Sequence, residues 1–488
     1  MARVTVFSIE SCPYCRKAKG LLADNEIPYT EISLSDYPEK RSQMIKLAKQ
    51  STVPQIFFNE KHIGGATELE SLGAATMKKI WKEAQKSGKS PSVEALQVPD
   101  YPPKPQPKAS QRENEAYKGP KKTMSVVELV LAIERELGTH FSGTGFISWV
   151  SDAFGFSDRK EATKLASKII TKGVLASETN PHGTNKEVSD STARYGLYRV
   201  SQNRGALNVF RKWTDRVDDP LVVVTVLKKQ LGNVLNAHRE SDGSVNYAAA
   251  SQDPEFHNFE EAICEVQTIV LEKIEPKARK AFVINLYNTL TLHAFVKVGI
   301  PKTSSERVDF FGRRGYVIGG NFYSFNALEN GLLRGNKTPP YALSKTIGPN
   351  DARRRAVLTL DPRIHTALNC GSKSCPPIKK FTSEAVEEEL DVAAASFFEQ
   401  EENCSVDATT GTVRLSKIIY WYKSDFGSTN RQVLETVVRF LSGEKRAAME
   451  SLLASGSFTV KYNVYDWSTD ANASVPFSKT ASSHCIVS

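Results

Sequence analysis

The first 85 residues alternate between short apolar runs and amphipathic stretches. The apolar runs predict β-strands at residues 3–8, 29–33, 55–58 and 61–63. Between them, apolar positions with a helical repeat predict helices at residues 13–24, 37–49 and 67–84. Because strands alternate with helices, the pattern predicts an α/β domain over residues 1–85.

The next region, residues 123–203, has the pattern of a small helical domain that ends in a hairpin. Its first helix begins at Ser125, which with Glu128 forms a capping-box sequence, and ends at Gly138. Further elements are predicted as helices at residues 145–154 and 158–172 and as a last strand at residues 195–200. Three helices followed by a terminal hairpin predict a winged-helix shape.

The largest region contains a helix, predicted at residues 276–299, that is apolar nearly all round. Within it, Asn285, Thr289 and His293 are spaced four residues apart and share one stripe, and Asn288 lies beside them. Burying such a stripe without polar partners would be costly. We therefore expect a buried helix whose polar stripe meets polar groups from another part of the chain.

Length and local composition predict the domain organisation. A chain of 488 residues corresponds to about three domains. One stretch is rich in proline and lysine and predicts a semi-extended linker, and the last residues are rich in Ser, Thr and Ala and predict a flexible tail. The predicted chain is multidomain, with α/β and α+β parts, divided as residues 1–85, 86–122 (linker), 123–203, 206–466 (mainly helical) and 467–488 (tail).

Composition and charge exclude several classes of protein. Apolar residues make up 40% and charged residues 24%, which excludes a wholly disordered, collagenous or coiled-coil chain. Seven cysteines are too few for a disulfide scaffold. The net charge of +9 is mild, so no nucleic-acid partner is expected. We expect no secretory signal, and polar residues interrupt the best membrane-spanning candidate at residues 281–300. A reducing, cytoplasmic location is therefore expected.

Two cysteines stand where the first predicted strand passes into the first helix, in the sequence Cys12-Pro13-Tyr14-Cys15. This spacing places Cys12 at a helix N-terminus, which stabilises a thiolate, and Cys15 one turn further on, where it can resolve a mixed disulfide. Positive charge that should lower the pKa of Cys12 further comes from Arg16, Lys17 and Lys19. A zinc site would need two more ligands, and this domain offers only His62, so no metal is expected.

Two further features of this domain point to a peptide-like ligand. Val53 precedes Pro54, and a cis peptide bond there would present the backbone of Val53 to a ligand. Gly64 and Gly65 precede a predicted helix start, whose free N–H groups can bind a carboxylate. Both features are consistent with a redox site that binds a small peptide.

These motifs resemble those of a dithiol glutaredoxin of the bacterial glutaredoxin-three type. The matching sequences are CPYC at residues 12–15, TVPQIF at 52–57 and HIGG at 62–65. The resemblance implies a thioredoxin fold and glutathione-dependent reduction of disulfides, with Cys12 as nucleophile and Cys15 as resolving thiol. It implies glutathione contacts at Tyr14, Thr52, Val53, Pro54, Gly65 and Thr67. Two positions depart from the family pattern, Ile9 in place of a lysine and Thr67 in place of an aspartate, and both remove charge from the glutathione site.

The second region resembles a DEP domain. The matching sequences are FSG at residues 141–143, ISW at 147–149, RKEA at 159–162, Gly173 and LYR at 197–199. The resemblance implies a signalling module that docks on membranes or membrane proteins. A winged helix can also bind DNA, but the basic residues of the third helix alternate with Glu161 and apolar residues, so a nucleic-acid partner is not favoured.

The polar stripe of the third region has a predicted partner in residues 361–377, which carry a histidine and two cysteines. The candidate residues are Asn285, Asn288, His293, His365, Cys370 and Cys375. They can form a structural hydrogen-bond network, a nucleophilic site in which a histidine activates a cysteine, or a metal site of the two histidines and two cysteines. We expect the two histidines and the two cysteines to converge in one pocket.

This region also resembles the family called domain of unknown function 547. The matching sequences are INLYNTLTLHAF at residues 284–295, DPRIHTALNCGSKSCPP at 361–377 and LSKIIYWYKSDFG at 415–427. The resemblance covers a core of about residues 275–427 and implies no particular reaction.

The last four residues, Cys485-Ile486-Val487-Ser488, form a C-a-a-X sequence, in which a terminal serine favours farnesylation of Cys485. The alternative is an ordinary tail. One prenyl chain anchors a protein only marginally, so the DEP-like region or the basic linker would have to supply a second membrane contact.

Three functions follow from these features. The first is a glutathione-dependent thiol–disulfide oxidoreductase that reduces protein disulfides or glutathione mixed disulfides at a membrane or signalling complex. The second is a redox-sensing signalling or adaptor protein without turnover. In the third, the C-terminal region is a Cys/His hydrolase and the dithiol domain is its accessory.

Overall fold

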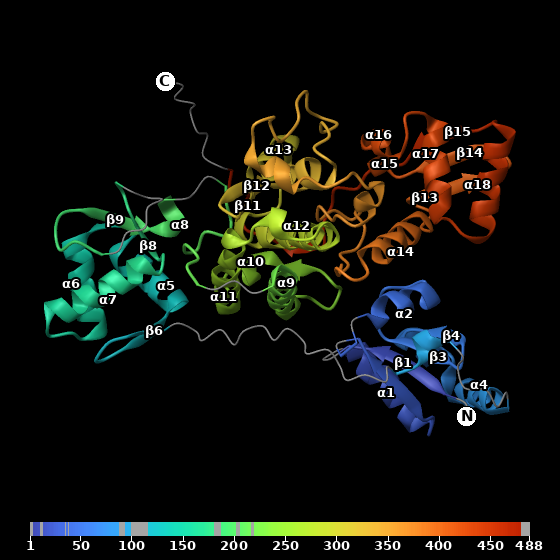
Figure 1. The fold of residues 1–488 in the computed structure, drawn as a ribbon, viewed down its shortest axis with the longest axis horizontal. Helices are drawn as coiled ribbons and strands as arrows, with labels where there is room; N and C mark the ends of the chain where they lie inside the picture. Colours follow the sequence, from blue (N-terminus) through green and yellow to red (C-terminus); the bar gives the residue numbers. More distant parts are fainter. Residues whose placement is uncertain are drawn as a thin grey trace. The chain divides into compact units, whose positions relative to one another are not determined.

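A computed structural model gives the fold of the chain (Figure 1). It describes residues 3–9, 13–34, 36–37, 39–86, 93–98, 116–179, 187–201, 205–215 and 219–479. Contacts divide the chain into two compact units: unit 1 has residues 1–108, 363–367 and 379–464, and unit 2 has residues 109–362, 368–378 and 465–488. The region expected to form one domain, residues 206–466, is therefore divided between the two units.

Unit 1 opens with a four-stranded mixed sheet in the order β2-β1-β3-β4. Its strands are β1 (Val4–Ser8), β2 (Tyr29–Ser33), β3 (Gln55–Phe58) and β4 (Lys61–Gly64). β1 pairs parallel with β2 and antiparallel with β3, and β3 pairs antiparallel with β4. The helices are α1 (Pro13–Asp24), α2 (Lys40–Ala48), α3 (Ala66–Ser71) and α4 (Gly73–Lys86).

The side chains of this sheet build two cores, because successive strand residues point to opposite faces. Val4 and Val6 pack with residues of α1, α3 and α4, whereas Phe7 packs with Met44 and Ile45 of α2. Helices therefore cover both faces, which is the arrangement of a thioredoxin fold. The predicted helix at residues 67–84 is instead two helices, and its break falls at Gly73, where φ is +67°.

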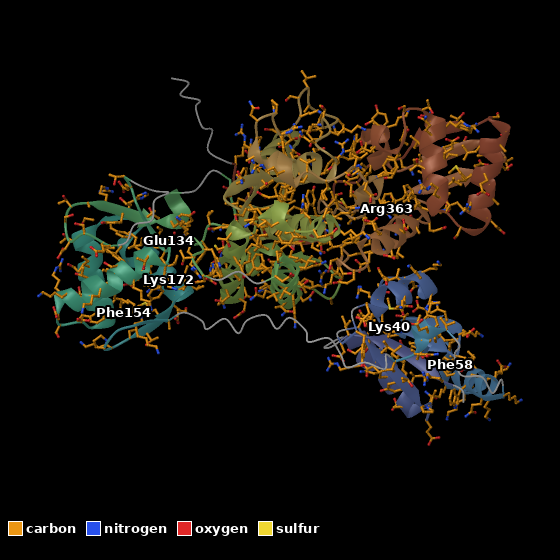
Figure 2. The ribbon with its side chains drawn as sticks, in the orientation of Figure 1. Lys40, Phe58, Glu134, Phe154, Lys172 and Arg363 are labelled. Atoms are coloured by element: carbon orange, nitrogen blue, oxygen red, sulfur yellow. The ribbon has the colours of Figure 1, made fainter. Side chains whose placement is uncertain are left out.

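Part of the predicted linker is folded onto this domain. The short 3-10 helix η1 (Glu94–Leu96) buries Leu96 in the core on the α2 side of the sheet. Lys40, labelled in Figure 2, is buried. Its ammonium donates to the backbone carbonyl of Glu94 at 2.8 Å. The linker prediction is therefore wrong for this segment, and residues 87–92 and 99–115 lie outside the described residues.

The rest of unit 1 consists of helices around a three-stranded sheet in the order β13-β14-β15. Its elements are α14 (Val386–Phe398), β13 (Cys404–Asp407), β14 (Thr412–Leu415), α15 (Lys417–Trp421), α16 (Lys423–Phe426), α17 (Asn430–Val437), η7 (Val438–Phe440), α18 (Gly443–Ser455) and β15 (Thr459–Tyr462). Within this unit, α14 contacts α2: Arg41 Nε lies 2.8 Å from Glu389 Oε1, and Ala385 and Val392 pack against the α2-side core.

Unit 2 begins with three longer helices, one four-residue helix and a three-stranded sheet in the order β7-β9-β8. The elements are β5 (Ala116–Lys118), β6 (Thr123–Ser125), α5 (Val126–Leu137), β7 (His140–Ser142), α6 (Gly143–Phe154), α7 (Arg159–Thr171), β8 (Leu175–Ser177), β9 (Arg194–Leu197) and α8 (Tyr198–Ser201). The capping box of Ser125 and Glu128 is present, and Gly138 ends α5, as predicted. The linker prediction is wrong for β5, which pairs with β6, and the last strand ends at Leu197 rather than at residue 200.

The remainder of unit 2 surrounds one long helix, α12 (Pro276–Val298), of whose 23 residues 17 are buried. The surrounding elements are α9 (Pro220–Ala237), β10 (Val245–Asn246), α10 (Tyr247–Ala250), α11 (Pro254–Ala262), η2 (Ile263–Thr268), η3 (Leu271–Lys273), α13 (Ser304–Arg313), β11 (Gly315–Ile318), β12 (Asn321–Ser324), η4 (Ala327–Leu333), η5 (Ala352–Ala356) and β16 (Ala471–Ala473). This confirms the predicted buried helix. Among the described residues, no helix has the length and hydropathy needed to span a membrane.

Much of the predicted flexible tail is part of this fold. β16 pairs parallel with β10, and the Ser478 N–H donates to the Val298 carbonyl at the end of α12 at 2.9 Å. The ring of Phe477 lies 6.4 Å from that of Phe310. The tail prediction is therefore wrong up to Lys479, and the C-a-a-X sequence with Cys485 lies outside the described residues.

Candidate functional site

The first candidate site lies at the start of α1. Cys15 is 1% exposed and disulfide-bonded. The other described cysteines, Cys264, Cys370, Cys375 and Cys404, are free thiols. Cys12, the predicted nucleophile, lies outside the described residues. The structure thus places the predicted resolving cysteine in the first turn of the helix, shielded from solvent.

The positive charge expected around this dithiol is partly neutralised. Lys17 Nζ lies 2.7 Å from a carboxylate oxygen of Glu70, and Lys19 Nζ lies 2.9 Å from one of Glu31. Arg16 is exposed and forms no ion pair with another described residue. The sequence analysis missed both carboxylates because they come from β2 and α3, which are close to α1 only in the folded domain.

The peptide bond between Val53 and Pro54 is cis, as predicted. The loop before it is held by Gln55, whose amide donates to the Thr52 carbonyl at 3.0 Å. Gln55 also lies 2.6 Å from Nε2 of His62, and partial burial lowers the pKa of this histidine, which favours its neutral form. Gln55 and His62 therefore support the predicted ligand loop, a role that the sequence analysis did not assign to either of them.

The predicted carboxylate site at the start of α3 already holds a carboxylate of the chain. The Gly65 N–H donates to Glu68 Oε2 at 2.8 Å. Gly65 also lies close to the cis-proline loop, since a Cβ on it would stand 3.4 Å from the Pro54 carbonyl oxygen. Thr67 and Tyr14 are exposed. A ligand carboxylate would therefore meet an accessible threonine and a competing glutamate.

The second candidate site is the loop of Cys370 and Cys375 in unit 2. Asn288 of α12 accepts the Asn369 N–H at 2.9 Å, and the Thr291 hydroxyl donates to the Asn369 carbonyl at 3.0 Å. The predicted contact between the polar face of α12 and this segment is thus present. Gly371 has φ +88°, and a Cβ on it would stand 2.2 Å from the ring of Phe295, so the loop requires glycine there.

This loop brings the two sulfur atoms to within 2.9 Å of each other. The Cys370 N–H donates to Cys375 Sγ at 3.1 Å, and the Tyr465 hydroxyl lies 3.2 Å from each sulfur. Ser372 Oγ lies 3.4 Å from Cys375 Sγ and 2.6 Å from the Tyr465 oxygen. The result is a compact cluster of two thiols and two hydroxyls.

The cluster separates the acidities of its two thiols. Burial opposes ionisation of Cys375, but hydrogen bonds from Cys370, Ser372 and Tyr465 outweigh it and lower the pKa of Cys375 to about 6. The hydrogen bond to Cys375, together with burial, raises the pKa of Cys370 well above its ordinary value. Burial and the two sulfurs raise the pKa of Tyr465 as well. Near neutral pH, Cys375 is therefore the thiolate and its two neighbours stay protonated.

The two histidines have other partners. His293 is fully buried, its Nδ1 lies 2.9 Å from the Tyr316 hydroxyl, and its ring stands edge-on to Phe259. Burial lowers the pKa of His293 to about 3, so it is a weak proton acceptor. His365 belongs to unit 1, where Nε2 lies 2.9 Å from a carboxylate oxygen of Asp425 and the ring stacks on Tyr422.

For His293, the hydrogen bond to Tyr316 favours the first of the three alternatives, a structural hydrogen-bond network. Asn285 is buried, and its carbonyl accepts the Thr289 hydroxyl at 2.9 Å. Over the ranges that the structure describes, no group of three or more His, Cys, Asp and Glu residues is placed to hold a metal ion.

Two residues of this site, Tyr465 and Ser372, were not predicted from the sequence. Tyr465 is distant in sequence from the cysteines, whereas Ser372 lies between them.

Comparison with known proteins identifies the N-terminal domain. A model of the family described as Glutaredoxin matches residues 4–63. Glutaredoxin 3 of Escherichia coli (strain K12) is 42% identical over 74 residues, which are 15% of this chain and 89% of that protein. The chain belongs to the glutaredoxin family. A glutaredoxin of Pseudomonas aeruginosa is 37% identical to the glutaredoxin domain over 75 residues, again 89% of that protein.

Solved structures are similar to the same glutaredoxin domain. The buckwheat glutaredoxin–glutathione complex is 28% identical and covers 17% of this chain and 80% of that chain, with a TM-score of 0.16. The glutaredoxin of Brucella melitensis is 35% identical and covers 18% and 94%, also with a TM-score of 0.16. Family membership assigns thiol oxidoreductase activity to the glutaredoxin domain.

A second family model, described as "Protein of unknown function, DUF547", matches residues 271–398. The match includes all of α12 and the loop of Cys370 and Cys375. The glutaredoxin domain is thus joined to a DUF547 domain that carries a second pair of neighbouring thiols.

Proposed function

We propose that the glutaredoxin domain is a glutathione-dependent reductase of protein disulfides or glutathione mixed disulfides. The observation that carries this proposal is the buried Cys15 in the first turn of α1, within a domain that also has the cis Val53–Pro54 bond. A solved relative is a complex with glutathione, which supports the same ligand here.

In the proposed reaction, the Cys12 thiolate attacks a disulfide and forms a mixed disulfide while one thiol leaves. Cys15 then attacks Cys12, which releases the second thiol and leaves a Cys12–Cys15 disulfide. Two molecules of glutathione restore the dithiol and become glutathione disulfide. With Thr52 and the backbone beside the cis-proline, Gly65, Thr67 and Tyr14 are the proposed glutathione contacts.

The full chain tests this proposal in an assay that couples reduction of a glutathione mixed disulfide to glutathione reductase. Turnover supports the enzyme. Repeated oxidation and reduction of the cysteines without turnover would support the rival function, a redox-sensing adaptor, and would contradict the proposal.

We also propose that residues 116–201 dock the enzyme on a membrane or membrane protein, as a DEP-like winged helix, with farnesylated Cys485 as second contact. The support is the order of three helices and a three-stranded sheet in this part of unit 2. Cell fractionation tests it: Cys485→Ser should move the full chain to the soluble fraction. Equal membrane fractions for both proteins would contradict the lipid contact.

The hydrolase alternative for the C-terminal region has less support. A hydrolase of this kind needs a histidine that takes the proton of the cysteine. Within unit 2, His293 bonds to Tyr316 and is a weak proton acceptor, and the groups that bond to the two thiols are the Cys370 backbone N–H, the other thiol and two hydroxyls. These surroundings of Cys370 and Cys375 favour thiol–disulfide exchange, which needs no histidine base.

A further inference from the structure

We propose that Cys370 and Cys375 are a second redox-active dithiol, in which Cys375 attacks a small anionic disulfide and Cys370 closes the bond. This site lies in the DUF547 domain and is independent of the proposed function of the glutaredoxin domain. It would give the chain two thiol–disulfide centres.

The geometry of the loop suits closure. A disulfide bond requires sulfur atoms about 2.05 Å apart, and these two are already in contact at 2.9 Å. The loop turns back on itself at Gly371, and the Cys375 N–H donates to the Ser372 carbonyl at 3.0 Å. The turn therefore holds the two sulfur atoms beside each other.

The two other free cysteines of the described chain, Cys264 and Cys404, are structural thiols and serve as a comparison for the burial and acidity of the pair. Cys264 and Cys404 are fully buried, and burial raises the pKa of each to about 12. Cys370 and Cys375 are only partly buried. The pair is therefore less enclosed than the two structural thiols.

The roles of the two thiols follow from their hydrogen bonds. Cys375 accepts from the Cys370 backbone and lies beside the Ser372 and Tyr465 hydroxyls, so its thiolate is stabilised. The other titratable groups around it are Cys370 and Tyr465, and both stay protonated near neutral pH. A thiolate beside a protonated thiol is the arrangement of an attacking and a resolving cysteine.

The surface next to the loop indicates the charge of the substrate. Lys373, between the two cysteines, is exposed, and its N–H donates to the Ser468 carbonyl at 2.8 Å. Ser468 lines a surface hollow of about 480 Å³ whose charged lining residues are Lys302 and Arg307. The Arg307 guanidinium lies 4.4 Å from the ring centre of Trp467, and the Trp467 ring lies 4.6 Å from that of Tyr465, tilted by 59°. One carboxylate, Asp466, lies beside them, and hydrogen bonds from Ser468 and the charge of Lys373 lower its pKa. The three cations outnumber it, so the surface fits a disulfide that carries carboxylates, such as glutathione disulfide.

The proposed step conserves atoms and electrons. The Cys375 thiolate attacks one sulfur of glutathione disulfide, and one glutathione leaves as a thiolate that takes up a proton. Cys370 loses its proton and attacks Cys375, which forms the Cys370–Cys375 disulfide and releases the second glutathione. The dithiol is oxidised by two electrons and glutathione disulfide is reduced by two; the glutaredoxin dithiol or excess glutathione reverses the reaction.

Peptide mapping of the full chain tests this proposal in the Cys12→Ser/Cys15→Ser background, which removes the glutaredoxin dithiol. Trypsin cleaves after Arg363, Lys373 and Lys379, so the two cysteines fall in separate peptides, residues 364–373 and 374–379. After incubation with glutathione disulfide and alkylation of free thiols, the two peptides should be joined until a reductant is added. Separate peptides with both cysteines alkylated would overturn the proposal.

Single variants in the same background test the roles. Cys370→Ser should accumulate a glutathione mixed disulfide on Cys375, whereas Cys375→Ser should leave Cys370 free. The reverse result would overturn the assignment. Arg307→Gln should slow closure by glutathione disulfide at least about threefold but not closure by cystamine, a cationic disulfide; equal slowing of both would contradict the anionic substrate. Because the glutaredoxin cysteines are absent, failure here says nothing against the proposed function.

Discussion

The two pairs of cysteines in this chain obtain their chemistry from different levels of structure. The pair in the glutaredoxin domain is placed by local sequence, since Cys15 lies in the first turn of a helix that begins at Pro13. The pair in the DUF547 domain lies on a loop that Asn288 and Thr291 hold from α12. The hydroxyl that contacts both sulfur atoms belongs to Tyr465, which lies 90 residues after Cys375 in the sequence. The spacing of Cys12 and Cys15 was enough to predict a dithiol, whereas Cys370 and Cys375 could be named from the sequence as candidates but their shared hydroxyl partner could not.

The largest expected effect is the loss of turnover when the glutaredoxin dithiol is removed, which leaves the pair of Cys370 and Cys375 intact. Cys12→Ser in the full chain should abolish glutathione-linked turnover, because the proposed nucleophile is lost, and Cys15→Ser should retain reduction of glutathione mixed disulfides. The coupled assay measures both. In Cys12→Ser, the second pair should still form its disulfide with glutathione disulfide. If that disulfide disappears together with the turnover, the two pairs are not independent.

A change in the backbone of the second loop should have the next largest effect. Gly371→Ala puts a methyl group against Phe295 at a position with φ +88°, which should lower the free energy of unfolding of unit 2 by about 3 kcal/mol. Urea unfolding, followed by alkylation of the buried Cys264, measures this. Gly348→Ala is the matched control, because nothing lies within 4 Å of its Cβ position. If Gly371→Ala and Gly348→Ala lower the free energy of unfolding equally, the loop does not require glycine at position 371.

The acidity of Cys375 should respond to Tyr465. The thiolate dominates above the pKa of about 6, instead of the ordinary 9.0, so alkylation should speed up as pH rises through about 6. Tyr465→Phe removes one hydroxyl donor and should raise this pKa by about one unit, which slows alkylation several-fold at pH 6.5. Tyr420→Phe, at an exposed tyrosine, is the control. An unchanged pH profile in Tyr465→Phe would refute this role.

The smallest expected effect concerns the glutathione site. The Glu68 carboxylate accepts a hydrogen bond from the Gly65 N–H, so its negative charge opposes binding of a ligand carboxylate at that N–H. Glu68→Gln should lower the KM for glutathione about threefold, as expected from removing one partly screened charge at a helix start. Steady-state kinetics of the full chain measure this, with Glu83→Gln on α4 as the control. A higher KM in Glu68→Gln would show that the carboxylate helps binding.

The sequence predicted features that depend on neighbouring residues. The limits of α1, the cis Val53–Pro54 bond, the capping box at Ser125 and the buried helix α12 were all predicted and are all present. Each depends on contacts within a few residues or on a periodic pattern.

Features that depend on distant contacts were missed, except the contact between α12 and the loop of Cys370 and Cys375. The polar, proline-rich stretch around Leu96 does not resemble a core segment, yet Leu96 completes the α2-side core. The ion pairs of Lys17 and Lys19 depend on partners from other elements. His293 appeared to be a candidate base because its spacing fits, but Tyr316 and the aromatic rings around it make it a structural residue. The sequence pattern identified the buried polar residues of α12 and the segment that they meet, but not the individual partners of each side chain.

A redox titration of the unaltered full chain tests the central claim, that the chain carries two separate dithiols. The chain is equilibrated in buffers of varied ratio of glutathione to glutathione disulfide, alkylated and digested with trypsin. The account predicts two transitions: one in which the peptide of Cys12 and Cys15 gains an internal disulfide, and one in which residues 364–373 and 374–379 become joined. If the second pair stays alkylated as two free thiols across the whole series, the account of two dithiols is contradicted.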